Sequence, residues 1–178
     1  MTAWRPGDQQ SDRASMLRVD QAGEYGATRI YAGQLAVLRR NCPEAKLIAR
    51  MAAQEERHLK RFNQLMAERR GRPTALQQLW NVAGFALGAA TALMSEKAAL
   101  ACTDAVETEI DRHYSSQLAA LGDDDPELAA DIADFQADEL EHRDTARSAG
   151  AAQAVGYPLL TAMIRAGCRV AIGLSKRI

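Results

Sequence analysis

The chain contains the sequences Glu55-Glu56-Arg57-His58 and Glu139-Leu140-Glu141-His142, two copies of a glutamate followed three residues later by a histidine. Residues three apart lie on one face of an α-helix, so each copy can direct a carboxylate and an imidazole toward one point. A single copy on a charged helix would usually be a surface ion pair, because acid–base pairs at this spacing are common. The repetition favours a shared site instead.

Each copy is preceded by an isolated glutamate at a matched distance. Glu24 lies 31 residues before Glu55, and Glu107 lies 32 residues before Glu139. Four helices that supply four glutamates and two histidines form the ligand set of a carboxylate-bridged dinuclear metal site in a helical bundle. The candidate metal ligands are therefore Glu24, Glu55, His58, Glu107, Glu139 and His142.

The repeat extends beyond the candidate ligands. A shift of 83 residues superposes identical residues at several positions, and a shift of 84 superposes the two Glu-x-x-His motifs. The pairs include Ala22 with Ala105, Glu24 with Glu107, Arg29 with Arg112, Tyr31 with Tyr114 and Gln34 with Gln117. The sequence therefore predicts two related helical hairpins within an all-α four-helix bundle.

Composition limits the class of protein. The 178 residues suit one domain spanning 1–178, with residues 1–12 expected to be a flexible N-terminus. The net charge of −1 argues against nucleic-acid binding driven by overall charge. Cys42, Cys102 and Cys168 stand far apart, which favours buried thiols in a reducing compartment. Residues 1–12 show no signal or transit peptide pattern, so we expect a bacterial cytoplasmic chain or one already trimmed.

Turn signals divide the chain into six helices, and no alternation typical of strands is present. The breaks are Asn41-Cys42-Pro43, Gly71-Arg72-Pro73 and the acidic segment 122–126. The first expected helix starts between residues 11 and 15 and ends near 39, and the second runs from 43 to 70. The third runs from 74 to 94, and the fourth follows it and ends near 121. The fifth runs from 126 to 148, and the sixth from 158 almost to 178. The third and sixth carry no candidate ligand.

These two additional helices have unusual compositions. Residues 73–95 contain no charged side chain, but their apolar run is shorter than the roughly 20 residues that span a bilayer. No acid follows Asp144, whereas Arg165 and Arg169 lie one helical turn apart. An uncharged helix beside a basic amphipathic one suits a membrane interface, where cations meet anionic headgroups. The alternative is ordinary bundle packing with a solvated basic edge.

Three further segments support a family resemblance. Together with both Glu-x-x-His motifs, residues 19–27 (VDQAGEYGA), 80–88 (WNVAGFALG) and 166–171 (AGCRVA) resemble the demethoxyubiquinone hydroxylase family, and the resemblance runs from about 17 to 178. Members are ferritin-like di-iron monooxygenases that act late in ubiquinone biosynthesis. They add the ring hydroxyl that is later methylated, and they work peripherally at the inner membrane.

The resemblance implies two iron ions per chain, held by the six candidate ligands. It also implies a polyprenylated demethoxy-benzoquinone or quinol substrate, dioxygen and an unidentified reductant. The expected location is the cytoplasmic face of a bacterial inner membrane, as a homo-oligomer or in a complex with other ubiquinone-biosynthesis proteins. The ligand types are consistent with iron, because carboxylates and imidazoles without a thiolate suit iron or manganese better than structural zinc.

Residues around the ligands have candidate supporting roles. By similarity to other di-iron proteins, the residue before each Glu-x-x-His motif bonds the opposite histidine, which pairs Asp138 with His58 and Gln54 with His142. Such contacts would hold each imidazole in one tautomer. Asp138 could equally be a solvated surface acid.

Two tyrosines follow the candidate ligands Glu24 and Glu107 at the same interval. Tyr31 and Tyr114 stand two helical turns after Glu24 and Glu107, so either could relay protons or electrons. The alternative is a buried tyrosine whose hydroxyl is satisfied, which we favour for Tyr31. Tyr114 is thus the candidate catalytic tyrosine, and His113 is expected to support the site rather than to bind metal.

The two additional helices also bear on how the substrate's tail is bound and on which competing functions fit the sequence. The third and sixth helices could line an apolar groove for the tail, with candidate walls Trp80, Phe85, Leu87, Leu160 and Ile164. A soluble ferroxidase or peroxidase resembling ferritin or rubrerythrin would need neither of these helices. A membrane-surface scaffold with a metal-free polar network would have to bury six polar groups at high cost.

Overall fold

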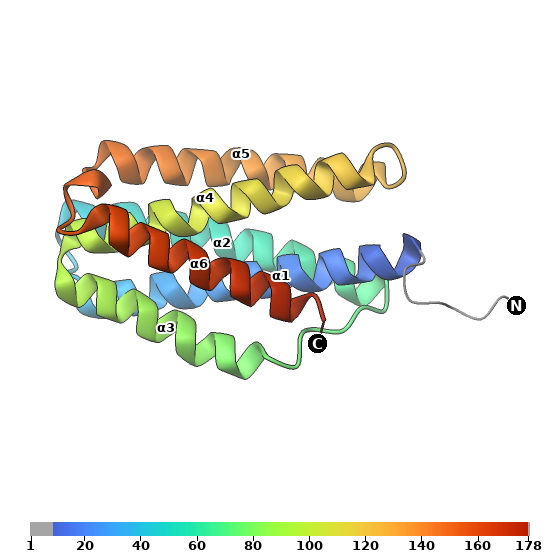
Figure 1. The fold of residues 1–178 in the computed structure, drawn as a ribbon, viewed down its shortest axis with the longest axis horizontal. Helices are drawn as coiled ribbons and strands as arrows, with labels where there is room; N and C mark the ends of the chain where they lie inside the picture. The colour runs from blue at the N-terminus through green and yellow to red at the C-terminus, as the bar shows by residue number, and fades with distance from the viewer. Residues whose placement is uncertain (1–8, 178) are drawn as a thin grey trace, which may run out of the picture.

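The described part of the chain folds into six α-helices. The computed structural model describes residues 9–177, with side chains from residue 13, and this part contains no strand. The elements are α1 (Gln9–Val37), α2 (Pro43–Glu68), α3 (Gln77–Met94), α4 (Glu96–Leu121), α5 (Pro126–Ser148), a 3-10 turn (Ala151–Gln153) and α6 (Tyr157–Ser175). In Figure 1, α1, α2, α4 and α5 lie side by side, with α3 and α6 along one side of them. The predicted all-α class is confirmed.

Local signals explain most helix boundaries. Pro43 and Pro126 occupy the first turns of α2 and α5, where a missing N–H costs nothing. Gly122, at φ +49°, ends α4 in a conformation that suits glycine. α3 begins at residue 77 and not 74, and α6 ends at 175, so both are shorter than predicted. α1 begins at Gln9, two residues before the predicted start; residues 1–8, most of the expected flexible segment, lie outside the described residues.

α3 packs against α1 almost backbone to backbone. A Cβ atom added to Gly88 would lie 1.9 Å from the carbonyl oxygen of Ile30, and one added to Gly33 would lie 2.1 Å from that of Phe85. No side chain fits at such distances, so both positions require glycine. The contact fixes α3 over the helix that carries Glu24.

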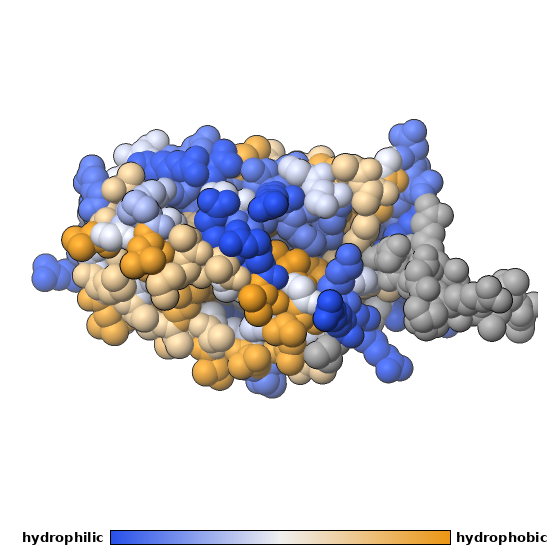
Figure 2. Space-filling view, viewed as in Figure 1, coloured by the Kyte–Doolittle hydropathy of each residue, from blue (hydrophilic) through white to orange (hydrophobic). Residues whose placement is uncertain are grey.

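An apolar surface covers α3 and α6. Large hydrophobic side chains are exposed on both helices, and Figure 2 shows this hydrophobic region below a hydrophilic one. They are Leu79, Val82, Phe85, Leu93 and Met94 on α3, and Leu159, Met163, Val170 and Leu174 on α6. We name this set the α3–α6 apolar face. Among the described residues, no helix is both long and apolar enough to cross a membrane.

The paired arginines of α6 have a partner inside the fold. Arg165 Nε and Arg169 Nη1 donate to the same carboxylate oxygen of Glu109 on α4, at 2.7 and 2.9 Å. Glu109 is buried, whereas both arginine side chains are partly exposed. Glu109 therefore neutralises one of the two charges, and the expected contact of these arginines with lipid headgroups stays a prediction.

Candidate metal centre

The six candidate ligands meet in the middle of the bundle, and none is more than 2% exposed. α1 supplies Glu24, α2 supplies Glu55 and His58, α4 supplies Glu107, and α5 supplies Glu139 and His142. Their donor atoms form two groups, each with atoms within 4.8 Å of one another. One group is Glu24, Glu55, His58 and Glu139; the other is Glu55, Glu107, Glu139 and His142. Glu55 and Glu139 belong to both groups, as carboxylates that bridge two metal ions would.

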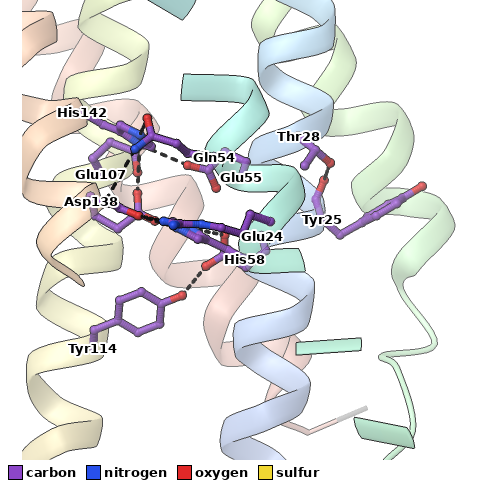
Figure 3. Close-up of polar contacts among 12 residues, drawn as sticks. Glu24, Tyr25, Thr28, Gln54, Glu55, His58, Glu107, Tyr114, Asp138 and His142 are labelled. Carbon is purple, nitrogen blue, oxygen red and sulfur yellow. Dashed lines mark hydrogen bonds and ion pairs between the residues drawn. The ribbon is translucent and has the colours of Figure 1, made fainter. Parts of the chain in front are cut away.

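Both histidines turn the same nitrogen toward the centre. His58 Nδ1 lies 3.1 Å from Glu139 Oε1, and His142 Nδ1 lies 3.1 Å from Glu55 Oε1. The outer nitrogens make the predicted contacts: His58 Nε2 with Asp138 Oδ2 at 2.9 Å, and His142 Nε2 with Gln54 Oε1 at 3.0 Å (Figure 3). Because each outer partner is an acceptor, Nε2 carries a proton, and Nδ1 is the nitrogen that faces the centre.

The outer partners also bond one another. Gln54 Nε2 donates to Asp138 Oδ1 at 3.5 Å, which leaves its amide oxygen to accept from His142. Arg57 donates to Asp138 as well. This chain of contacts gives both imidazoles a fixed orientation, and it shows that Asp138 is not merely a solvated surface acid.

The electrostatics of the site suit a bound cation. Burial raises the pKa of Glu55, Glu107 and Glu139, and repulsion among the carboxylates adds to the shift at Glu55 and Glu107. Buried donor atoms of all six candidate ligands have no hydrogen-bond partner. Burying such atoms unpaired is costly. Divalent cations would satisfy them, so the donor set fits a dinuclear metal site.

The two tyrosines contact the candidate ligands crosswise. Tyr31 on α1 donates to Glu107 Oε1 on α4 at 2.6 Å, and Tyr114 on α4 donates to Glu24 on α1. Both rings are 1% exposed. The alternative of a buried tyrosine with a satisfied hydroxyl therefore describes both residues, and a relay role for Tyr114 stays a prediction.

His113 lies outside both ligand groups, as expected for a supporting residue. Its Nε2 lies 3.2 Å from Oδ1 of Asp20, and burial raises the pKa of Asp20. Sequence reasoning missed Asp20. Its position, one helical turn before Glu24, could have indicated a second acid on the same face of α1.

An apolar cavity of about 490 Å³ lies between α1, α3, α4 and α6. Four of the five predicted groove walls line it: Trp80, Leu87, Leu160 and Ile164. Phe85 does not; its ring lies 37% exposed under the guanidinium of Arg29, 5.4 Å from the ring centre. At one end Trp80 Nε1 donates to Ser175 Oγ at 3.0 Å, which ties α3 to α6.

The family model for ubiquinone biosynthesis protein COQ7 matches residues 11–175. This chain belongs to the COQ7 family. It is 56% identical over 162 residues to a 3-demethoxyubiquinol 3-hydroxylase of Rhodospirillum rubrum. The aligned region covers 91% of this chain and 76% of that relative.

Eukaryotic COQ7 relatives are also similar over most of the chain. A mitochondrial NADPH-dependent 3-demethoxyubiquinone 3-hydroxylase of Mus musculus is 52% identical over 166 residues, covering 91% of this chain and 76% of the relative. A mitochondrial 5-demethoxyubiquinone hydroxylase of Saccharomyces cerevisiae is 43% identical over a region that covers 92% of this chain and 77% of that relative. The predicted resemblance is confirmed.

Proposed function

We propose that this chain is a 3-demethoxyubiquinol 3-hydroxylase, a monooxygenase that inserts one oxygen atom of dioxygen into a ring C–H bond of a polyprenylated demethoxy-benzoquinol. The reaction consumes two electrons and two protons and releases water with the hydroxylated ring. The observation that carries the proposal is the pair of buried ligand groups sharing Glu55 and Glu139, in a chain whose curated relatives are hydroxylases.

The six candidate ligands of the bundle would hold two iron ions, whose chemistry when bound is the reduction of dioxygen. Glu55 and Glu139 would be shared between the ions, while Glu24 with His58 and Glu107 with His142 would complete the two positions. Asp138 and Gln54 keep the imidazoles in the metal-binding tautomer. Tyr114, bonded to Glu24, would pass a proton toward the centre.

The apolar cavity would hold the ring and the start of the tail. Its volume of about 490 Å³ is roughly three times the ~150 Å³ that accommodates benzene in an apolar core. A polyprenyl tail exceeds that space, so the remainder must leave the protein. Each methylene exposed to water would cost about 0.8 kcal/mol, which requires an apolar surrounding outside the cavity.

The α3–α6 apolar face would provide that surrounding by lying on the membrane, at the cytoplasmic face of the bacterial inner membrane. Leu93 and Met163 are 74% and 66% exposed on this face. Leu93→Glu and Met163→Glu should each weaken sedimentation with anionic lipid vesicles. Ala53→Glu, on an exposed position of α2, is the matched control and should sediment normally. Equal sedimentation of all three would refute the membrane-interface assignment.

The function is tested by loading the protein anaerobically with ferrous iron and adding a demethoxyquinol, NADPH as reductant and ¹⁸O₂. We expect two irons per chain and a product heavier by one labelled oxygen atom. Glu55→Gln should abolish the product, whereas Glu56→Gln, its exposed neighbour, should not. Iron oxidation without a hydroxylated product would instead favour the ferroxidase alternative, and full activity without metal would refute the dinuclear site.

A further inference from the structure

The apolar cavity does not open onto the metal centre. Between them lies a second, smaller space that is too narrow to hold a water molecule. Its lining residues are Ala27, Ile30, Tyr31, Thr103, Val106 and Glu107. Ala27, Ile30 and Val106 also line the cavity, whereas Tyr31, Thr103 and Glu107 line the inner space alone. These three shared residues therefore separate the cavity from the candidate metal ligand Glu107.

The two larger side chains of this wall belong to the helices that carry the site. Ile30 precedes Tyr31 on α1, and Val106 precedes Glu107 on α4. Both are buried, at 8% and 6% exposure. Directly behind them, Tyr31 donates its hydroxyl to Glu107 Oε1, while Glu107 Oε2 has no hydrogen-bond partner. A ring that leaves the cavity through this wall would meet the Glu107 side of the centre first.

We propose that Ile30 and Val106 form a gate that determines which rings reach the metal centre, a role that rests on the proposed hydroxylase function. A ring held in the cavity reaches Glu107 only when these two side chains shift. Because interiors are close-packed, the volume of the gate side chains limits the size of the ring substituents that pass. Until the ring arrives, the closed gate keeps water in the cavity away from the ligands.

Two valine-to-alanine variants separate the gate from the rest of the cavity. Val106→Ala removes two methyl groups at the gate, and Val19→Ala removes the same two elsewhere in the cavity wall, since Val19 lines the cavity but not the inner space. Both valines are buried, so the two variants should lose similar stability. A difference between them then reports on position rather than on folding.

The first measurement needs no metal. Crystals of the iron-free protein under xenon should hold xenon in the cavity, because apolar cavities bind it. Val106→Ala should show an additional xenon site beside Glu107 and Tyr31, whereas Val19→Ala should show none there. Xenon beside Glu107 in the unchanged protein, or its absence there in Val106→Ala, would overturn the gate.

The second measurement compares two quinols in iron-loaded protein, one of them with a ring substituent longer by one methylene. One methylene in an apolar pocket changes discrimination about tenfold or more. Val106→Ala should raise the relative kcat/KM for the larger ring about tenfold, Val106→Ile should lower it, and Val19→Ala, which widens the cavity but not the gate, should change it much less. An unchanged ratio in Val106→Ala would overturn the selection role. Failure of the unchanged protein to hydroxylate either ring would refute the proposed function and leave the xenon result standing.

Discussion

The hairpins α1–α2 and α4–α5 repeat the same ligand set but differ outside it. In both, a glutamate and a Glu-x-x-His motif reach the centre, and each tyrosine bonds the glutamate of the other hairpin. The outer partners break the symmetry. His58 contacts the carboxylate of Asp138, whereas His142 contacts the neutral amide of Gln54. The repeat thus preserves the candidate metal ligands and lets the groups that contact them from outside differ.

The two imidazoles accordingly have different electrostatic surroundings. Burial lowers the pKa of both, but at His58 the nearby carboxylates of Glu139 and Glu24 outweigh burial and raise the pKa to about 10. At His142 burial prevails and the pKa stays below its ordinary value. A histidine bonded to a carboxylate is also the more basic metal ligand. We therefore expect two inequivalent metal positions.

Changes to the outer partners should have the largest effect on this comparison. Asp138→Ala removes a charged acceptor and should lower iron affinity at one position by roughly 10–100-fold, while Gln54→Ala should cost less. Asp138→Asn keeps a contact but makes the two halves alike, so the difference between the two iron signals in Mössbauer spectra should narrow. Equal losses in Asp138→Ala and Gln54→Ala would show that the halves are equivalent. Glu141→Gln, an exposed neighbour, is the control.

The convergence of the candidate ligands and their outer partners could be predicted because it depends on spacing along a helix. Glu139 and His142 share a face at an interval of three residues, and Asp138 follows from its place before the motif. Pro43 and Pro126 likewise predict where two helices begin. Such signals are local, so they survive without knowledge of how the helices pack.

What depends on helix rotation and packing could not be predicted. Glu109 and Arg165 are 56 residues apart, and nothing in the sequence pairs them. Phe85 belongs to an apolar helix, but its ring lies against Arg29 of α1 and does not line the cavity. The gate residue Val106 looks like any core valine until the cavity on one side and Glu107 on the other are known.

Substitution of the two tyrosines should have a smaller effect than substitution of Asp138 or Gln54, and a similar one at both positions. Tyr31→Phe and Tyr114→Phe each delete a buried hydrogen bond to a carboxylate, which should lower the free energy of unfolding by about 1.5–3 kcal/mol in denaturant titrations. If Tyr114 relays protons, Tyr114→Phe should also slow hydroxylation in a single turnover at unchanged iron content, and Tyr31→Phe should slow it less. Equal rates in both variants would contradict the relay and leave only the structural role.

The smallest expected effect concerns the starts of α2 and α5, which repeat as Cys42-Pro43-Glu44 and Asp125-Pro126-Glu127. Each first residue caps its helix by accepting a hydrogen bond from the backbone N–H three residues later, at 3.4 Å for the Cys42 thiol and 3.2 Å for the Asp125 carboxylate. A thiol is a weak acceptor. The second hairpin is therefore the better capped of the two.

Removing the cap of α5 and strengthening that of α2 tests whether the difference between the two caps affects stability. Asp125→Ala should lower the free energy of unfolding by about 1 kcal/mol, and Cys42→Asp should raise it by about 0.5–1 kcal/mol. Hydrogen bonds from Arg69 hold the pKa of Asp125 below its ordinary value of 3.8. The carboxylate therefore stabilises the fold fully at neutral pH, and this contribution is lost as the pH falls through that lowered pKa. The difference between Asp125→Ala and the unchanged protein should accordingly shrink on acidification in thermal denaturation; a difference that does not depend on pH would assign the effect to packing instead.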